Sequence, residues 1–440
     1  MKKILIISYF FPPCNLVGAQ RPYSWYKHFH KFGLYPVVIT RHWNHEVKTM
    51  SDANFPDNTP PKIERHDWGE VHFLPYKGTF RDRFLARHGK KFGPIRRLIT
   101  LWELVFQYIS FSQNPYKFIY TYIESLAKTE HWSAIVVSAN PFPLFAVGNR
   151  LSKKYNIPWV ADYRDDWTTN GLTQKSWIDR YFLLPLEQAC EKRWLSSCRF
   201  FSSVTAEYVH KIGALINKKG ILVLNGYENL SVSPPSIFDG ELKLLYAGTV
   251  YGIQDFSILA DGALLYHKKT KRPVKIIFAG ALLGNQAPPP LEKMRYALGG
   301  SAVTLDVLSR MEAARFDELM KTSNALLMVP YGSEKGIISA KIFHYLSSGK
   351  PILLAGKEGG IIESTLTPYS LAYISHSTQE VCTALEEITE RYMNQNTKPT
   401  HEDLEYLSRF SRESQSRIFA ENINKYLVDN SIENQRSILL

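Results

Sequence analysis

The stretch GIISAKIFHYLSSGKPILL, residues 336–354, is the most informative part of this chain for its fold. It predicts a short helix that begins at Ser339 as N-cap and ends at Gly349. Ile342, Phe343 and Leu346 form the apolar face of this helix. The apolar run PILLAG follows at once, and a helix that leads directly into a continuous apolar strand is typical of a parallel α/β sheet.

The other face of the same helix is small and polar, with Ala340, Lys341, His344, Ser347 and Ser348 at three- and four-residue spacing. Lys341 falls in the first turn, where the helix dipole and free amides favour an anion and disfavour a cation. A bound phosphate would resolve that conflict. The alternative is that Lys341 and His344 are solvated surface residues.

Strand-like apolar runs recur along the chain in two series, separated by helical patterns. The first series is 3–10, 36–40, 133–139, 158–163 and 200–205, and the second is 242–248, 274–280, 325–330 and 351–356. Short continuous apolar strands that alternate with helices indicate parallel sheets, so two series predict two doubly wound domains. The Pro-, Gly-, Asn- and Ser-rich segment 224–240 is the predicted hinge between them.

Composition narrows the class of protein. A chain of 440 residues is long enough for two cores, and its net charge of +12 favours acidic partners. The four cysteines show neither a disulfide framework nor metal-ligand spacing, and no apolar run approaches the roughly 20 residues of a membrane span. We therefore expect a cytoplasmic protein that contains no metal site.

Glycines follow several of the predicted strands, at the sheet edge where ligands of open α/β folds bind. Gly18 precedes a helical pattern that carries Arg21, and Gly248–Thr249 and Gly280 end two strands of the second series. Backbone amides at such turns could approach a nucleotide closely. The absence of GxGxxG weighs against a dinucleotide-dependent dehydrogenase. A simple strand-to-helix turn remains the alternative for Gly18.

Acidic residues cluster after another strand, in WVADYRDDWTTN at 159–170. Asp162, Arg164, Asp165 and Asp166 lie where a strand ends, and a carboxylate there could orient an acceptor hydroxyl or accept its proton. The adjacent arginine would keep one carboxylate ionised. The alternative is an Asp–Arg pair that pins a loop, a role we consider for Asp162.

Residues 77–111 combine a basic run with an amphipathic helix. Seven Lys or Arg residues follow Lys77 up to Arg97, and LITLWELVFQYISF comes directly after them with one narrow polar stripe. That combination suits an anionic membrane surface. A domain helix beside a solvated basic loop is the alternative, and no nucleic-acid-binding module accompanies the charge.

At this point the chain resembles a known family. AGTVYG, LNGYE and SAKIFHYLSSGKPIL resemble the C-terminal domain of GT-B glycosyltransferases of the retaining family 4. YFFPPCNLVGAQRPYSW, SANPFP and ADYRDDWT are similar to a branch that builds bacterial surface polysaccharides. The resemblance implies two Rossmann-like domains that face a central cleft. Residues 1–228, with a returning C-terminal helix at about 410–440, would bind the acceptor, and residues 229–409 would bind a nucleotide sugar.

The same resemblance implies roles for particular residues. The donor site would comprise Gly18, Arg21, Gly248, Thr249, Gly280, Gly336, Ile337, Ile338, Lys341 and His344. The family often carries an Arg and a Lys after the first strand of the second domain. They are missing here, which makes Lys341 the candidate for phosphate. Two glutamates eight residues apart are usual around this helix, and their positions fall on Gly336 and His344. Asp165, with Asp162 and Arg164, is the catalytic candidate.

The expected function is transfer of a sugar from a nucleotide diphosphate sugar to a lipid-linked or oligosaccharide acceptor in bacterial polysaccharide biosynthesis. The resemblance implies a retaining reaction that needs no metal or other cofactor, on the inner face of the cytoplasmic membrane. Two alternatives remain open: a sugar-nucleotide 2-epimerase on the same fold, and a degenerate nucleotide-sugar-binding subunit without activity.

Overall fold

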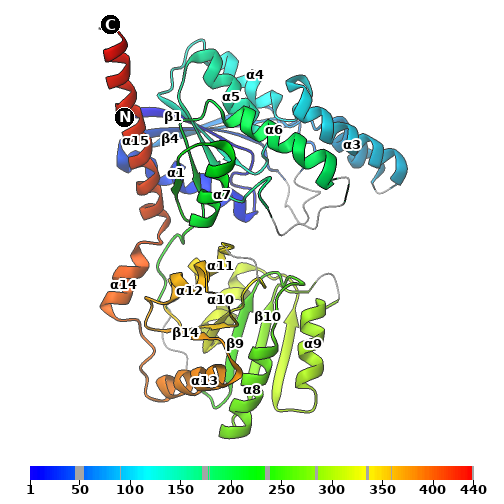
Figure 1. Cartoon of the computed structure of the whole chain (residues 1–440), viewed down its shortest axis with the longest axis vertical. Coiled ribbons are helices and arrows are strands. Elements are labelled where there is room, and N and C mark those ends of the chain that lie inside the picture. The colour runs from blue at the N-terminus through cyan, green and yellow to red at the C-terminus, as the bar shows by residue number, and fades with distance from the viewer. Residues whose placement is uncertain are drawn as a thin grey trace. The chain divides into compact units, whose positions relative to one another are not determined.

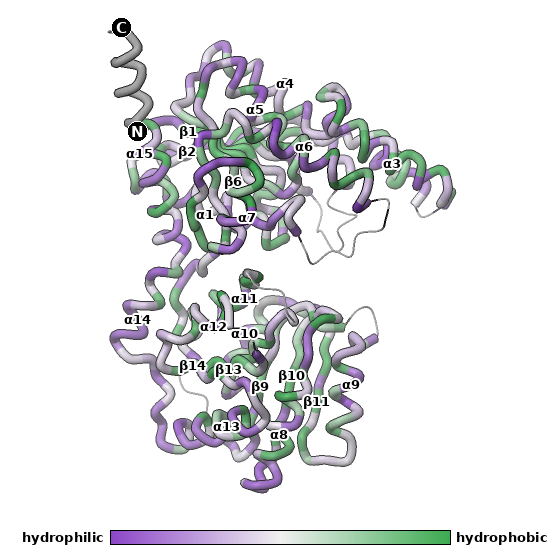
Figure 2. Tube along the Cα trace, in the orientation of Figure 1, coloured by the Kyte–Doolittle hydropathy of each residue, from purple (hydrophilic) through white to green (hydrophobic). Residues whose placement is uncertain are grey.

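The chain folds into two compact units, Met1–Leu224 with Arg412–Leu440 and Asn225–Ser411. The sequence placed the corresponding boundaries at 228/229 and 409/410. The computed structural model describes residues 1–44, 54–89, 91–170, 177, 179–232, 238–282, 286–332, 336–357 and 359–438. Figure 1 shows the α/β architecture of each unit, and Figure 2 shows the hydrophobic residues gathered on the strands.

The first unit is built on an eight-stranded sheet in the order β3-β4-β2-β1-β5-β6-β7-β8. Neighbouring strands are parallel except for the β3–β4 pair. The strands are β1 (Lys2–Ser8), β2 (Leu34–Arg41), β3 (Lys62–His66), β4 (Gly69–Leu74), β5 (Ala134–Ala139), β6 (Trp159–Tyr163), β7 (Phe200–Ser203) and β8 (Gly220–Leu222). The five predicted strands of this series are confirmed. The prediction omitted β3, β4 and β8, because β3 is charged and exposed and β8 has only three residues.

Helices cover both faces of this sheet, and each face has its own core. Its α-helices are α1 (Gln20–His28), α2 (Phe80–His88), α3 (Gly93–Ile109), α4 (Lys117–Leu126), α5 (Leu144–Tyr155), α6 (Leu184–Leu195), α7 (Ala206–Ile216) and α15 (Arg412–Ile438). Alternate residues of β1 enter opposite cores, because successive strand side chains point to opposite faces. Helices α4, α5, α6 and α7 cover one face, and α1 and α15 cover the other.

The C-terminal helix α15 belongs to the first unit, as predicted. The Phe419 ring lies 4.9 Å from that of Trp25 on α1, and Phe419, Ala420 and Ile423 are almost fully buried. Burial of three apolar side chains stabilises this docking by several kcal/mol, at about 25 cal/mol per Å² of apolar surface. The last helix therefore completes the core that the first helix begins.

The second unit has a six-stranded parallel sheet in the order β11-β10-β9-β12-β13-β14. The strands are β9 (Leu242–Ala247), β10 (Val274–Ala279), β11 (Val303–Leu308), β12 (Ala325–Met328), β13 (Ile352–Ala355) and β14 (Ala372–Ser375). The α-helices are α8 (Ser257–Thr270), α9 (Pro289–Leu298), α10 (Ala313–Thr322), α11 (Lys341–Ser347), α12 (Ile361–Leu366), α13 (Thr378–Met393) and α14 (His401–Ser408). The sheet grows outward from β9 in both directions, and right-handed crossovers then place α8 and α9 on the face opposite α11 and α12 (Figure 1).

The decisive stretch forms the helix α11 and the strand β13. Its apolar face is confirmed, because Ile342, Phe343 and Leu346 are fully buried. Gly349 has a φ of 66°, the left-handed conformation that favours glycine after a helix. The predicted start is wrong by one position, since Ala340 rather than Ser339 is the N-cap residue. Within the described chain no helix is long and apolar enough to cross a membrane.

Candidate functional site

The carboxyl ends of β9 and β10 meet in two glycine turns in the second unit. Gly248 and Gly280 have φ values of 91° and 78°, which glycine adopts readily. The Gly248 amide donates to the Ala279 carbonyl at 2.8 Å, and a Cβ on Gly280 would lie 3.8 Å from the Gly248 Cα. Gly248 and Thr249 are exposed, so this edge presents an open backbone surface. The structure thus brings three of the predicted donor residues together.

Lys341 stands at the start of α11 and reaches the same edge of the sheet. Its Nζ lies 3.5 Å from the centre of the Tyr246 ring, the last but one residue of β9. Burial alone lowers the pKa of Lys341 to about 7. Among the described residues, no carboxylate raises the pKa of Lys341. A desolvated cation beside an aromatic ring can interact favourably with an incoming anion.

The aromatic ring beneath Lys341 is held by a buried network. The Tyr246 hydroxyl donates to Oε1 of Gln254 at 3.1 Å, and Nε2 of Gln254 donates to the Val329 carbonyl at 3.0 Å. The Tyr345 hydroxyl of α11 accepts from the Ala247 amide at 2.7 Å. These bonds fix α11 and the loops after β9 and β12 to one another. Tyr246 could not be recognised as a site residue from the sequence, because its apolar strand pattern is equally that of a core tyrosine.

Four more of the predicted donor residues lie in or just before α11, whereas Gly18 and Arg21 belong to the first unit. Gly336 has a φ of 84° and is buried, Ile337 is half-buried, and Ile338 is 7% exposed. His344 is exposed on α11. Glu334, two residues before the first position at which the family usually has a glutamate, lies outside the described residues. Gly336, Ile337 and Ile338 thus lie between β12 and Lys341, and His344 lies three residues after Lys341.

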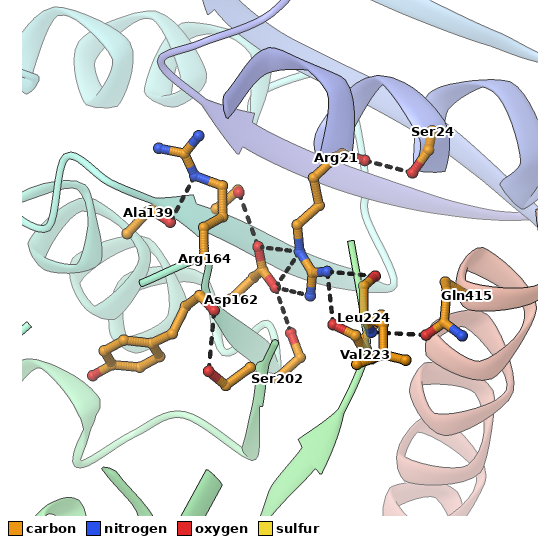
Figure 3. A network of polar contacts seen from close by, with 12 residues as sticks. Arg21, Ser24, Ala139, Asp162, Arg164, Ser202, Val223, Leu224 and Gln415 are labelled. Carbon is orange, nitrogen blue, oxygen red and sulfur yellow. Dashed lines mark hydrogen bonds and ion pairs between the residues drawn. The ribbon is translucent and has the colours of Figure 1, made fainter. Parts of the chain in front are cut away.

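In the first unit, Arg21 of α1 is paired with Asp162 of β6 (Figure 3). Arg21 Nη2 and Asp162 Oδ1 are 2.7 Å apart, and the two side chains are 4% and 0% exposed. The carboxylate also accepts from the Ser138 and Ser202 hydroxyls, at 3.0 and 2.7 Å. Arg21 donates further to the Val223 and Leu224 carbonyls.

This pair changes two expectations. The anion that meets Arg21 is a carboxylate of the same unit, and the arginine that pairs with Asp162 is not the neighbouring Arg164. A buried charge with a complete set of partners holds β6, α1 and the end of β8 together. Among the two alternatives for Asp162, this geometry favours the one in which it pins the structure.

Arg164 points away from Asp162, toward the end of β5 (Figure 3). Its Nε donates to the Ala139 carbonyl at 3.1 Å and its Nη2 to the Asn140 carbonyl at 2.9 Å. A Cβ on Gly18 would lie 1.5 Å from Arg164 Nη1, so a larger residue there would force the guanidinium out of its present position. Burial lowers the pKa of Arg164, and the charge of Asp165 opposes that change. Gly18 and Arg164, which were predicted to have separate roles, are thus direct neighbours in the structure.

Two carboxyl groups follow Arg164 on the same loop. Asp165 is exposed, whereas Asp166 is 5% exposed and burial raises the pKa of its carboxyl to about 6. Glu191 of α6 anchors this loop by accepting hydrogen bonds from Tyr163 at 2.8 Å and Thr168 at 2.6 Å. From the sequence, Asp166 could be identified only as part of an acidic cluster. Which of the two adjacent carboxyl groups is buried depends on the fold.

Residues 77–111 form the helix pair α2 and α3. Two residues of the predicted polar stripe, Thr100 and Glu103, face α2. Glu103 accepts from the Thr79 hydroxyl and from the Arg81 amide, both at 2.8 Å, and Arg81 Nε donates to the Thr100 hydroxyl at 3.0 Å. The apolar side is left in solvent, where Leu98, Leu101, Trp102, Phe106 and Ile109 are 38–69% exposed. Lys90, one residue of the predicted basic run, lies outside the described residues.

Metal ligands were not expected from the sequence. Over the ranges that the structure describes, no group of three or more His, Cys, Asp or Glu side chains is placed to hold a metal ion. Metal independence stays a prediction.

Solved structures similar to this one cover almost the whole chain. Sucrose-phosphate synthase from Thermosynechococcus elongatus matches 98% of this chain and 100% of its own, with a TM-score of 0.59 and 12% identity. The chain has the fold of GT-B glycosyltransferases. A glycosyltransferase from Rickettsia africae matches 98% of this chain and 99% of its own, with a TM-score of 0.57 and 10% identity.

The Anabaena protein HepE, solved with UDP and glucose, covers 96% of this chain and 100% of its own, at a TM-score of 0.53 and 12% identity. No family model and no curated protein matches the sequence. At these identities the likeness shows the GT-B fold, and the prediction of fold class is confirmed.

Proposed function

We propose that the protein is a glycosyltransferase that moves a sugar from a nucleotide diphosphate sugar to a glycan acceptor. The observation that carries the proposal is Lys341, a partly buried ammonium group beside two glycine turns at the carboxyl edge of the second sheet. This is the edge at which open α/β sheets bind their ligands. Proteins of similar fold have been solved in complex with UDP, UDP-glucose or ADP, which supports a nucleotide donor here.

The diphosphate would lie over Gly248, Thr249 and Gly280, with its negative charge against Lys341. The two glycines have no Cβ, so the diphosphate can approach the backbone closely there, and its charge would restore to the Lys341 amine the proton that burial disfavours. The exposed imidazole of His344 would hydrogen-bond a ribose hydroxyl in place of the glutamate usual in the family.

In the reaction, the bond between the sugar C1 and the β-phosphate oxygen breaks and a bond from C1 to the acceptor oxygen forms. The developing negative charge stays on the diphosphate, where Lys341 stabilises it. In the retaining course that the family resemblance implies, the acceptor proton passes to the departing phosphate on the same face of the sugar. These steps invoke no metal or other cofactor.

On the acceptor side, Asp165 is the exposed carboxylate at the end of β6. It would accept a hydrogen bond from the acceptor hydroxyl and so orient the attacking oxygen. Arg164 beside Gly18 would add positive charge at the same edge of the first sheet. Asp165→Asn keeps the shape of the side chain, so turnover should fall at least tenfold while donor affinity stays within twofold.

We propose further that the acceptor is lipid-linked, as in bacterial polysaccharide assembly, and that α3 meets the membrane. Leu98, Leu101, Trp102, Phe106 and Ile109 form an exposed apolar face, and Arg83, Arg87, Arg96 and Arg97 accompany it on the same helix pair. An amphipathic helix of this kind lies in the interface of an anionic bilayer. The inward-facing Glu103 leaves the outward side free of that acidic charge.

The transferase proposal is tested by measuring nucleoside diphosphate release from UDP-, ADP- and GDP-sugars, with bacterial membrane extract as the source of acceptor. Release that depends on the extract is expected. A new nucleotide sugar without release would identify the epimerase instead. Neither product with any donor would leave only a binding subunit.

Membrane contact is tested separately by sedimentation with phosphatidylcholine vesicles that do or do not contain phosphatidylglycerol. The Leu101→Ser/Trp102→Ser variant should lose binding to the anionic vesicles, because it removes apolar surface that would enter the bilayer. Tyr296→Ser, which removes an aromatic side chain that is 91% exposed on α9, is the matched control. Equal binding by both variants would contradict the proposed contact.

A further inference from the structure

The first unit contains a hollow that lies apart from the acidic loop after β6. It has a volume of about 820 Å³ and is bounded by α1, by the ends of β1 and β2, and by the β3–β4 hairpin. We call it the aromatic groove and define it by Phe11, Tyr23, Tyr26, His30, His66 and Trp68. The function proposed above makes no use of these residues.

The rings of the groove follow one another from the hairpin to the end of β1. The imidazole of His66 stacks on Trp68 with centroids 4.7 Å apart and planes 6° apart. Tyr26 follows at 6.5 Å from His66, and Phe11 at 5.8 Å from Tyr26. Trp68 is 40% exposed, so one large ring remains available to a ligand at the outer end. The groove is therefore a continuous aromatic track.

The inner end of this track reaches the edge where the acceptor is expected. Phe11 comes three residues after the last residue of β1, and its neighbour Phe10 lies under the guanidinium of Arg164, 5.4 Å from the ring centre. Phe10 also stacks on Trp43, a residue that lines the groove, at 5.6 Å. A ligand in the groove could thus extend from Trp68 toward Arg164.

Polar groups line the groove between the rings, including Lys62 and Glu64, which form an ion pair at 2.6 Å. Two buried atoms here have no partner within the described part of the chain: the Tyr26 hydroxyl and Nδ1 of His30. Tyr26 is only 6% exposed. Buried polar groups are normally paired, so an ordered water or a ligand hydroxyl would complete the hydrogen bonding of these two atoms.

An oligosaccharide satisfies both properties of the groove. A pyranose ring has a face of C–H groups that can pack flat on an aromatic ring, and its rim of hydroxyls can both donate and accept hydrogen bonds. Binding pockets of this size commonly combine aromatic walls with a few polar groups that orient the ligand. A bilayer would not fit, because the polar atoms lie in a hollow and not on a convex apolar face.

We propose that the aromatic groove binds the non-reacting sugar units of the acceptor, with one sugar stacked on Trp68 and another hydrogen-bonded near Tyr26 and His30. This inference rests on the proposed transferase function for the identity of its ligand. It makes the protein selective for acceptors that already contain several sugars, since a monosaccharide cannot reach both ends of the track.

The test measures direct binding of maltohexaose, chitohexaose and hexagalacturonate by saturation-transfer NMR and tryptophan fluorescence, without a nucleotide. At least one hexasaccharide should bind, and its monosaccharide should bind at least tenfold more weakly. Trp68→Ala should weaken the hexasaccharide at least tenfold, and Tyr26→Phe several-fold. Trp177→Ala, at a position 67% exposed, should stay within twofold.

Failure of this inference is distinguishable from failure of the proposed function. Donor-dependent release of nucleoside diphosphate together with no hexasaccharide binding, or with binding that Trp68→Ala leaves unchanged, would overturn the groove and leave the transferase standing. Binding that depends on Trp68 in a protein that releases no nucleoside diphosphate would support the groove as a glycan site and refute the transferase. Thermal melting of each variant confirms that it is folded.

Discussion

Lys341→Met is the most direct test of the donor site. The substitution keeps a long side chain over the Tyr246 ring but removes the ammonium group, whose Nζ lies 3.5 Å from the ring centre. Methionine packs well against aromatic rings, so α11 should keep its position. The variant therefore isolates the charge from the packing.

The size of the effect follows from the chemistry of a charge-assisted hydrogen bond. Such a bond to phosphate contributes about 1.5–3 kcal/mol, so the variant should bind the donor about 10- to 150-fold more weakly. The wild-type affinity should also depend on pH. With a pKa of about 7, the ammonium form falls from roughly nine-tenths at pH 6 to roughly one-tenth at pH 8, and affinity should fall about tenfold with it.

Calorimetry measures both quantities. The ligand is whichever of UDP-glucose, ADP-glucose and GDP-mannose gives the largest thermal shift, since the diphosphate diester of a nucleotide sugar has no group that titrates between pH 6 and 8. A phosphate beside Lys341 raises its pKa, so binding at pH 7 should take up about half a proton. Titrations in buffers of different ionisation enthalpy report that uptake, which Lys341→Met should abolish.

Lys350→Met is the matched control. Burial also lowers the pKa of Lys350, to about 8. However, Lys350 lies just before the amino end of β13, away from the glycine turns, and its Nζ donates to the Lys321 and Ser323 carbonyls at 2.8 and 2.7 Å. This variant should lose stability and keep donor affinity. Lys268→Met, at an exposed position of α8, is the control if Lys350→Met does not fold. Equal donor affinity in Lys341→Met and wild type, or an affinity independent of pH, would refute the assignment.

Three further changes test the first unit. Asp162→Ala leaves Arg21 buried without its partner and should lower the free energy of unfolding by about 3–5 kcal/mol in denaturant titrations; a loss below 1 kcal/mol would contradict the pinning role. Gly18→Ala places a Cβ on the Arg164 guanidinium and should impair turnover more than global stability, whereas unchanged kinetics would remove that contact from the site. The raised pKa of Asp166 means that the folded protein binds this proton more tightly, so stability should decrease as pH rises from about 4 to 6. Asp166→Asn should remove roughly 3 kcal/mol of that decrease in thermal melts, and an unchanged pH profile would place the titration elsewhere.

The sequence located the strands of both sheets wherever a continuous apolar run is buried on two faces. It failed for β3, β4 and β14, which lie at or beside a sheet edge, for β8, the short last strand of the first sheet, and for β11, the opposite edge of the second. Edge strands bury less apolar surface, so charged or alternating residues are tolerated and the pattern weakens. The start of α11 was misplaced because its N-cap makes no side-chain hydrogen bond.

Which charged side chains pair with one another was harder to predict than where the charged residues lie along the chain. Arg164 lies two positions from Asp162, and proximity in sequence suggested an ion pair. In the structure the partner of Asp162 is Arg21, 141 residues away, while Arg164 meets Gly18. The strand β6 ends at Tyr163, so Arg164 lies outside it and does not follow the alternation that would place residues two apart on the same face.

By itself, the sequence determined the α/β class, the two strand series and the glycine turns after β9 and β10, because apolar periodicity and glycine conformation are local properties. Only the tertiary structure decided which charges are compensated. It paired Arg21 with Asp162, left Lys341 over Tyr246 with its pKa lowered, and exposed the apolar face of α3. Desolvation and charge pairing depend on atoms that the fold brings from distant positions, and no local pattern contains that information.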